Sequence, residues 1–144
     1  MENIILEKSY KIINKYNQKS KEVKKYGTEQ YIYPAEIHMI EVIGSHEKIT
    51  TTQLADVLCI TKGAVSQTTA KLLQKGLIIK IESIKKNEMY ISLSEEGKIA
   101  YKNHRTLHKD MLDKINGILS NLPKESKDAL EKIFEVIDKS LDKI

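Results

Sequence analysis

The fold is decided by the stretch Ile60-Thr-Lys-Gly-Ala-Val-Ser-Gln-Thr-Thr-Ala-Lys-Leu-Leu-Gln-Lys-Gly76. Thr61 is placed to cap a helix, because a threonine hydroxyl can accept a hydrogen bond from the first turn of backbone N–H groups. Gly76 stands where a helix commonly ends on a residue with left-handed backbone angles. Residues between them recur at helical spacing, and those expected to face inward or pack closely are Ala64, Val65, Ala70, Leu72 and Leu73. The stretch therefore predicts one amphipathic helix.

A shorter helix is expected just before this one. Thr50 can cap it, and Gln53, three residues later, can return a hydrogen bond to the backbone of the capping residue. Leu54 and its apolar neighbours give this helix an inner side. Cys59-Ile60 leaves room for only a tight turn before the second helix. Two helices joined in this way are typical of a helix-turn-helix.

Beyond Gly76 the apolar spacing changes from the helical period to an alternation of every second residue, which is the pattern of β-strands. The alternation runs over residues 77–82 and returns over residues 89–94. Between these runs, Ile84-Lys85-Lys86-Asn87 forms a polar and basic tip. Two short helices followed by such a hairpin make a winged helix-turn-helix. We therefore expect a mainly α (α+β) fold.

Long amphipathic segments flank the winged helix on both sides. One helix is expected over residues 3–25, and another begins at Pro34, in the first turn where proline is well tolerated, and continues to about residue 45. After the wing, Ser94 and two acids mark the start of a helix over about 95–121. A last helix over 124–144 has a regular apolar stripe formed by Leu130, Ile133, Phe134, Ile137, Leu141 and Ile144.

The distribution of charge points to a nucleic-acid partner. The net charge of +4 is small, but residues 60–109 hold ten Lys or Arg against four acids, whereas residues 27–59 hold one Lys against five acids. A basic helix and a basic hairpin are what contact with phosphates requires. We therefore expect the winged helix to bind double-stranded DNA.

The flanking helices carry more apolar surface than the small winged helix can cover. A second copy of the chain is the economical cover, so these helices are expected to form a homodimer that reads a pseudo-palindromic operator. The expected organisation is an N-terminal dimerisation helix and connection (1–33), a winged helix-turn-helix DNA-binding domain (34–97) and C-terminal dimerisation helices (98–144).

Polar residues on the outer side of the second helix are the expected DNA contacts. Ser66 and Gln67 can hydrogen-bond to base edges, and Gln67 suits adenine best. Lys62 and Lys71 suit phosphate or guanine. Gly63 lets the backbone of the helix approach the DNA. Thr51 and Thr52, at the start of the preceding helix, suit phosphate. The complete expected DNA-binding set is Thr51, Thr52, Lys62, Gly63, Ser66, Gln67, Lys71, Lys85, Lys86 and Asn87.

Histidines and the single cysteine are the remaining groups that could carry chemistry. His104 and His108 are four residues apart on one helix face, and with His38 they form the one possible metal-binding group. We favour hydrogen bonds among them or to the backbone, because no further ligand is clearly placed, and we predict no metal and no cofactor. Cys59 is expected to be a small core residue, with a redox sensor as the alternative.

Other classes of protein are disfavoured. The sequence has no phosphate-binding glycine loop, no nucleophile motif and no paired carboxylates, so we do not expect an enzyme. It has no signal pattern and no apolar run near the roughly 18 residues of a membrane helix, so we expect a cytoplasmic protein without membrane contact. The alternative to a DNA-binding regulator is a winged-helix protein-interaction module, which would not need a basic helix and wing tip.

Four segments of the chain together resemble the MarR family of transcriptional regulators, and the resemblance covers essentially the whole chain. The segments are Ile49-Thr-Thr-Thr-Gln-Leu-Ala55, Ile60-Thr-Lys-Gly-Ala-Val-Ser-Gln67, Leu73-Gln-Lys-Gly-Leu-Ile78 and Ile91-Ser-Leu-Ser-Glu-Glu-Gly97. The resemblance implies a homodimeric winged-helix regulator, usually a repressor, that is often released from DNA by a small ligand. Some members of the family respond to zinc through helix histidines.

Two details refine this resemblance. The family's wing usually carries Asp-x-Arg, whereas this chain has Lys85 and Asn87 at those positions with Lys86 between them, so positive charge is kept without the arginine. The segments Pro34-Ala-Glu-Ile-His-Met-Ile-Glu-Val-Ile-Gly44 and Asn103-His-Arg-Thr-Leu-His108 resemble the branch that includes repressors of fatty-acid-synthesis genes. Those repressors respond to acyl chains on acyl carrier protein; a metal, an aromatic acid or no ligand at all would also fit this sequence.

Overall fold

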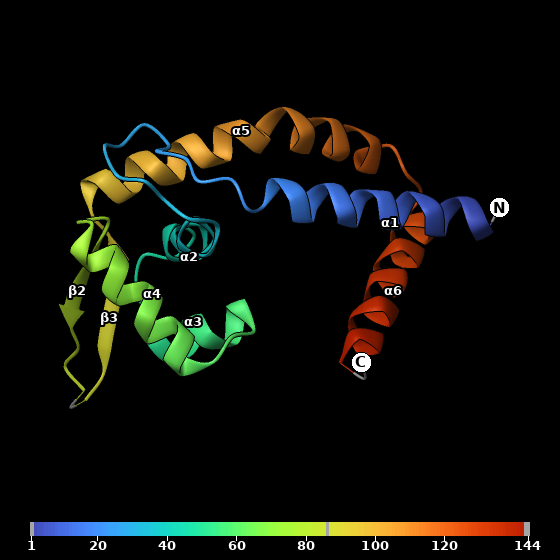
Figure 1. Cartoon of the computed structure of the whole chain (residues 1–144). Helices are drawn as coiled ribbons and strands as arrows, with labels where there is room; N and C mark the ends of the chain where they lie inside the picture. The colour runs from blue at the N-terminus through green and yellow to red at the C-terminus, as the bar shows by residue number, and fades with distance from the viewer. Residues whose placement is uncertain (1, 86, 143–144) are drawn as a thin grey trace. The chain divides into compact units, whose positions relative to one another are not determined.

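The helices and strands of the chain follow the expected order. The computed structural model describes residues 2–85 and 87–142, and Figure 1 shows its elements along the chain. The described elements are α1 (Glu2–Lys19), α2 (Pro34–Gly44), β1 (Ile49–Thr50), α3 (Thr51–Leu58), α4 (Lys62–Gln74), β2 (Ile78–Glu82), β3 (Met89–Leu93), α5 (Glu95–Ser120) and α6 (Lys124–Leu141). They confirm the mainly α (α+β) winged helix-turn-helix fold. Two compact units are present, with the boundary within α5 between Arg105 and Thr106.

Local hydrogen bonds define both helices of the helix-turn-helix. The Thr50 hydroxyl accepts a hydrogen bond from the Gln53 N–H at 3.2 Å, and the Gln53 side-chain oxygen accepts one from the Thr50 N–H at 2.9 Å. This is the expected capping box of α3. The Thr61 hydroxyl accepts from the Ala64 N–H at 3.1 Å and so caps α4. After α4, Gly76 has φ +69°, the left-handed conformation that the sequence predicted.

The wing belongs to a three-stranded antiparallel sheet in which β3 lies between β1 and β2. β2 and β3 form the expected hairpin, with Ile78 opposite Leu93. β1, which the sequence pattern did not predict, pairs with the other edge of β3 and places Ile49 opposite Ile91. Two residues are too few to show an alternation, so this strand is defined by its partner rather than by its own sequence.

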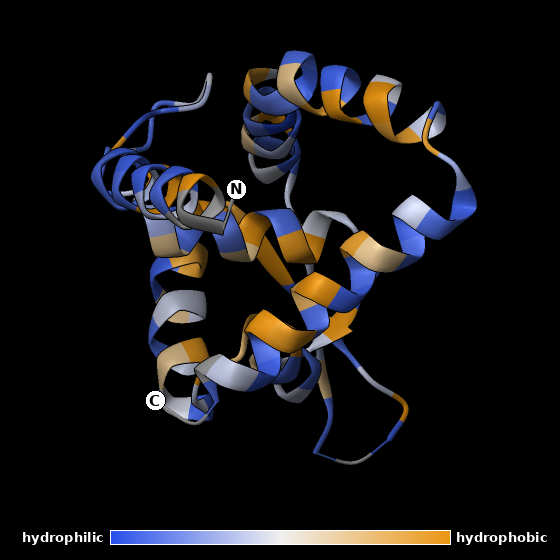
Figure 2. Cartoon of the chain, turned by 90° about the vertical axis from the view of Figure 1, so that its right-hand side faces the viewer, coloured by the Kyte–Doolittle hydropathy of each residue, from blue (hydrophilic) through white to orange (hydrophobic). Residues whose placement is uncertain are grey.

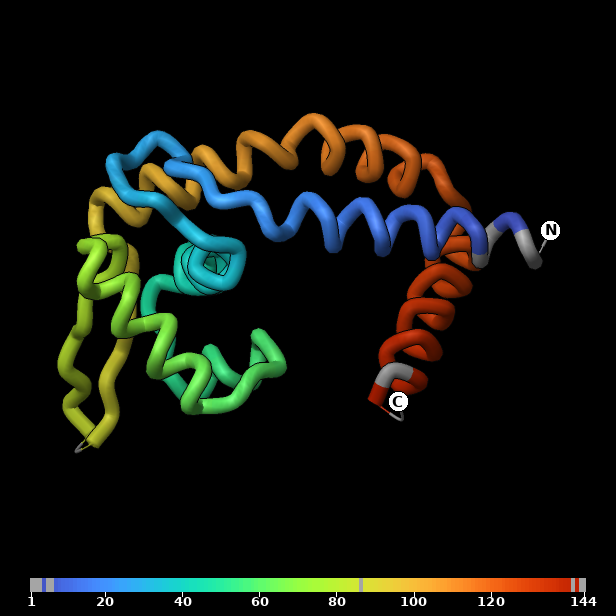
Figure 3. The backbone as a smooth tube through the Cα atoms, viewed as in Figure 1, coloured from blue at the N-terminus to red at the C-terminus, as the bar shows by residue number. Residues whose placement is uncertain are grey.

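The core of the first unit lies between the helices of the winged helix and one face of the sheet. α2 contacts α3, α4 and β3, and Figure 3 traces the backbone from α2 through α4 (cyan to green) into the hairpin. One residue of the core comes from the α1–α2 connection and one from α5. The buried apolar residues are Ile32, Ile37, Met39, Ile40, Ile43, Ile49, Leu54, Ala55, Val65, Leu72, Leu77, Ile78, Ile91, Leu93 and Ala100.

The first helix ends at Lys19, six residues before the expected end at residue 25. The following backbone instead pairs with itself, because the Ile32 N–H donates to the Lys24 carbonyl at 2.9 Å and the Lys24 N–H donates to the Ile32 carbonyl at 3.2 Å. Tyr26 and Gly27 reverse the chain with φ values of +49° and +80°. Burial of Ile32 in the core outweighs the helical spacing of the preceding residues.

The second unit contains the end of α5 and all of α6, and its apolar side chains are largely uncovered within one chain. In α6 the residues Leu130, Ile133, Phe134 and Ile137 are between 37% and 68% exposed. In Figure 2 the helix that leads to the C label carries apolar residues among polar ones. The side chains of Leu141 and Ile144, which belong to the same expected stripe, lie outside the described residues.

Candidate nucleic-acid interface

The exposed side of α4 is the first part of the candidate interface. Val65 and Leu72 are fully buried, which fixes the side of the helix that faces outward. At 3.6 residues per turn, small and polar residues form the middle of the outward side and lysines form its edges. The residues in the middle are Gly63, Ser66, Gln67 and Ala70, and those at the edges are Lys62 and Lys71; all six are exposed. The structure therefore gathers the expected α4 residues on one surface.

Two residues of α4 differ from the sequence prediction. Ala70, expected to pack inward, is exposed, so it adds a methyl group to the outward side. Thr69 takes the buried position instead and is 5% exposed. Its hydroxyl donates to the Val65 carbonyl at 2.8 Å, and this bond within the helix satisfies a polar group that would otherwise be costly to bury. A hydrophobicity pattern does not show that compensation.

A glycine lies in the middle of this surface without a structural need for it. A Cβ added at Gly63 would have as its nearest neighbour the Thr61 hydroxyl oxygen at 3.9 Å, which is an ordinary contact. The fold therefore has room for alanine at this position, although alanine is the better helix former. The missing side chain leaves the first turn of α4 accessible to an external partner.

The second part of the candidate interface is a surface hollow of about 520 Å³ between the start of α3 and the wing. Its lining includes Thr51 and Thr52 from α3 and Lys85 and Asn87 from the wing, four of the residues expected to bind DNA. The positive end of the α3 dipole, two hydroxyls and one ammonium group face a common space that suits an anion. Glu88 also lines the hollow, and its carboxylate accepts a hydrogen bond from the Ser83 hydroxyl at 3.4 Å.

Local hydrogen bonds connect the residues on either side of the wing tip. The Lys85 N–H donates to the Ser83 hydroxyl at 3.1 Å, and the Glu88 N–H donates to the Lys85 carbonyl at 3.3 Å. Asn87 has φ +68°, a conformation that asparagine tolerates better than most residues. Ile84 is fully exposed beside Lys85. The expected contact Lys86 lies outside the described residues.

The three candidate metal-binding histidines are not gathered into a site. Throughout residues 2–85 and 87–142, no three His, Cys, Asp or Glu side chains lie where they could share a metal ion. His104 Nδ1 instead lies 3.0 Å from Glu41 Oε2, and the His104 ring meets the Tyr26 ring edge-on at 5.6 Å. Burial raises the pKa of the Tyr26 hydroxyl above its ordinary value. His104 therefore takes part in packing between α2 and α5.

Cys59 contradicts the expectation of a core residue. It ends α3 with φ +52° and is exposed, with its sulfur 3.7 Å from the Asp56 carbonyl oxygen. The left-handed turn between α3 and α4 points this side chain outward, a consequence that composition alone does not reveal.

Among the described residues, no helix is both long and apolar enough to cross a membrane.

A family model and two curated relatives are similar to parts of this chain. The model of the MarR family matches residues 32–84, which run from the end of the α1–α2 connection into the wing. The chain is 31% identical over 84 residues to the uncharacterized HTH-type transcriptional regulator YhjH of Bacillus subtilis (strain 168), covering 58% of this chain and 48% of that protein. It is 27% identical over 107 residues to PchR of the same organism, covering 74% and 63%. The chain thus spans about half of the first relative's length and less than two thirds of the second's.

Solved structures of similar fold cover nearly the whole chain. Streptococcus pneumoniae FabT in complex with DNA has a TM-score of 0.73, with 24% identity and 99% of each chain covered. Lactococcus lactis ZitR in complex with DNA has a TM-score of 0.72, with 18% identity and coverage of 98% of this chain and 97% of that one. Adhesin competence repressor (AdcR) of Streptococcus pyogenes has a TM-score of 0.73, with 19% identity and coverage of 94% and 96%. At these identities the likeness concerns the fold, and the MarR family model matches the winged-helix part of the chain, residues 32–84.

Proposed function

We propose that this chain is a homodimeric, sequence-specific DNA-binding transcriptional regulator that acts in the cytoplasm as a ligand-responsive repressor. The observation that carries the proposal is the outward side of α4, where Ser66 and Gln67 are exposed between two lysines. In this proposal residues 34–97 bind DNA, and residues 1–33 and 98–144 hold two copies together.

The proposed contacts divide into readers of bases and holders of phosphates. Gln67 can form two hydrogen bonds with adenine, and the exposed methyl of Ala70 suits the methyl group of thymine. Lys62 and Lys71, at the two edges of the same side, are placed for the phosphates that border the major groove. Gly63 would let the first turn of α4 come close to the DNA backbone.

The hollow beside the wing is proposed to hold one phosphate of the same duplex. Thr51 and Thr52 would donate hydrogen bonds from their hydroxyls, and Lys85 would supply the charge. Asn87 and Lys86 would follow the backbone into the minor groove. Ile84, exposed at the tip, adds an apolar side chain that can contact the sugars of that groove.

The uncovered apolar residues of the second unit support the proposed homodimer. Five large apolar residues of α6 are more than one third exposed, and a contiguous apolar surface of this kind marks a site of association. Two copies would present two α4 helices, so the operator should consist of two similar half-sites about one DNA turn apart.

Direct DNA binding tests the proposal. Fluorescence anisotropy of the DNA upstream of the chain's own gene, titrated at several salt concentrations, should show tight binding that weakens steeply as salt rises. Gln67→Ala should weaken binding to the operator more than to random DNA, whereas Lys85→Ala should weaken both. Equal affinity for this DNA, other genomic fragments and random DNA would contradict the proposal and favour the protein-interaction module.

The same assay can assign the effector class. A long-chain acyl thioester is the first addition, because residues 34–44 and 103–108 resemble the branch with fatty-acid-synthesis repressors. Zinc is the second, because ZitR, a structure of the same fold, is described as a zinc-responsive MarR family member. Release from the operator by one addition and not by the other would identify the class of ligand.

A further inference from the structure

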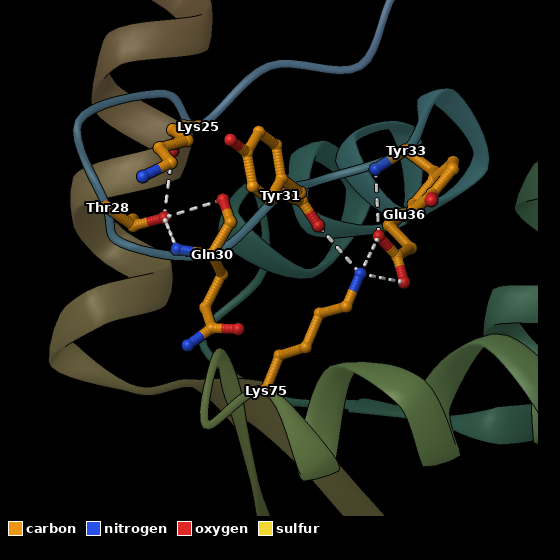
Figure 4. A network of polar contacts seen from close by, with 7 residues as sticks. All are labelled: Lys25, Thr28, Gln30, Tyr31, Tyr33, Glu36 and Lys75. Atoms are coloured by element: carbon orange, nitrogen blue, oxygen red, sulfur yellow. Dashed lines mark hydrogen bonds and ion pairs between the residues drawn. The ribbon is translucent and has the colours of Figure 1, made fainter.

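A buried ion pair joins the end of α4 to the start of α2 (Figure 4). The Lys75 ammonium donates to both carboxylate oxygens of Glu36, at 2.8 and 2.7 Å, and to the Tyr31 carbonyl at 2.7 Å. It also lies 5.0 Å from the centre of the Tyr33 ring. The side chain of Glu36 is 3% exposed and that of Lys75 is 21% exposed. Three groups, the Glu36 carboxylate, the Tyr31 carbonyl and the Tyr33 ring, therefore fix the position of this one nitrogen.

The carboxylate itself is held from a second direction. Glu36 Oε2 accepts a hydrogen bond from the Tyr33 N–H at 2.8 Å, which closes the first turn of α2. A carboxylate in the first turn of one helix and an ammonium at the end of another are both favoured by the helix dipoles. Neither side chain can move without breaking a hydrogen bond at a helix end.

The loop that supplies the Tyr31 carbonyl is also held in place, as Figure 4 shows. The Thr28 hydroxyl donates to the Lys25 carbonyl at 2.8 Å and accepts from the Gln30 N–H at 3.1 Å. The next residue after Tyr31, Ile32, is fully buried in the core. The ammonium of Lys75 therefore binds to parts of the molecule that are already fixed.

Lys75 differs in this respect from the two lysines on the outward side of α4. Lys62 and Lys71 are exposed along α4, whereas the charge of Lys75 is neutralised by Glu36 at the inner end of the helix. A buried ion pair is often no more stabilising than an apolar pair of similar size, and in some proteins its role is to select one geometry. The role that we consider for the Glu36–Lys75 pair is therefore to hold the end of α4 in one position against α2.

Resting on the proposed function, we propose that Glu36 and Lys75 are positioning residues for DNA recognition. The pair fixes the end of α4 against α2 and the α1–α2 connection, and so sets the angle at which Ser66 and Gln67 meet the bases. Neither residue touches DNA. If the end of α4 at Lys75 were not held, a small rotation of the helix would displace Ser66 and Gln67. Their hydrogen bonds to bases would then be lost, because hydrogen bonds tolerate only a narrow range of distances and angles.

The test compares variants for operator affinity, salt dependence and helix protection. The double variant Glu36→Gln, Lys75→Met leaves no unpaired buried charge, and Lys71→Met is the matched control on the exposed side of the same helix. The double variant should stay folded and dimeric, lose at least about tenfold in operator affinity, and keep the slope of log K against log salt. Lys71→Met should lower that slope by about one per protomer.

Two outcomes would overturn the proposal. Wild-type operator affinity in the folded double variant would show that the pair has no positioning role, and a lower salt slope for Lys75→Met alone would show that Lys75 contacts phosphate. If the double variant fails to fold, Glu36→Gln alone provides the test. It keeps hydrogen-bonding groups at this position, and its operator affinity should fall by less than that expected for the double variant.

Amide hydrogen exchange separates this inference from the proposed function. Without DNA, the double variant should exchange faster over residues 73–77 at the end of α4, while residues 49–58 of β1 and α3 remain as protected as in the wild type. That difference would be found even if the wild-type protein bound no operator. Unchanged exchange at the end of α4 would refute the positioning role independently of any DNA.

Discussion

Replacing Gly97 with alanine tests how tightly the start of α5 packs against the wing. A Cβ at Gly97 would collide with the Leu77 backbone carbonyl oxygen and would lie 3.3 Å from the Leu93 Cδ2 atom. The same short segment is tied by hydrogen bonds, because the Ser94 N–H donates to the Leu77 carbonyl at 3.1 Å and the Ser94 hydroxyl donates to the Gly76 carbonyl at 2.6 Å. A backbone atom cannot rotate away, so α5 itself would have to shift.

The opposing contributions can be compared in size. Alanine in place of glycine stabilises a helix by about 1 kcal/mol. Relieving the collision costs about 1–3 kcal/mol for overpacking, and loss of the hydrogen bond from Ser94 to Leu77 costs about 1 kcal/mol more. We therefore expect Gly97→Ala to lower the free energy of unfolding by about 2 kcal/mol. For a protein of this size that corresponds to a Tm lower by about 4–8 °C.

Thermal unfolding followed by circular dichroism measures this effect. Gly63→Ala is the control, because its Cβ would make only an ordinary contact and the helix should be unchanged or slightly more stable. All variants must be compared at one protein concentration, since the Tm of a dimer depends on concentration. A Gly97→Ala protein that melts with the Gly63→Ala control would refute the packing argument.

Other predictions concern caps, DNA and assembly. Thr50→Val should lower the free energy of unfolding by about 1 kcal/mol in urea denaturation, because it removes the capping box of α3. Lys85→Ala should lower the slope of log K against log salt by about one per protomer in DNA titrations, because it removes one proposed phosphate contact. Gly63→Ala should weaken DNA binding without lowering Tm, because its methyl group would stand between α4 and the DNA backbone. Ile133→Glu should shift the protein towards monomer in sedimentation velocity, because it places a charge in the proposed dimer surface.

Features with local causes could be predicted from the sequence. The capping box of Thr50 and Gln53 depends on two residues three positions apart, and the left-handed Gly76 depends on the end of its own helix. The outward position of Ser66 and Gln67 follows from the period of the apolar residues around them. For these features the relevant physics lies within a few residues of the chain.

Features with distant partners could not be predicted in the same way. The end of α1 is set by pairing of Lys24 with Ile32, and β1 exists because β3 is beside it. Glu36 and Lys75 are 39 residues apart, and neither has a local pattern that distinguishes it from an exposed charged residue. Such contacts arise from the tertiary fold, which overrides local preference.

The uncovered helix α6 ties folding to DNA binding under the proposed dimer. Most of the stability of a helix in a protein comes from packing its apolar face, and in α6 the side chains of Leu130, Ile133, Phe134 and Ile137 are between 37% and 68% exposed. Association would therefore both stabilise the second unit and bring two copies of α4 to one operator. Because the same association stabilises the second unit and pairs the α4 helices, DNA with two half-sites should favour the dimer. Substitutions that weaken the dimer far from the DNA should therefore lower operator affinity most at low protein concentration.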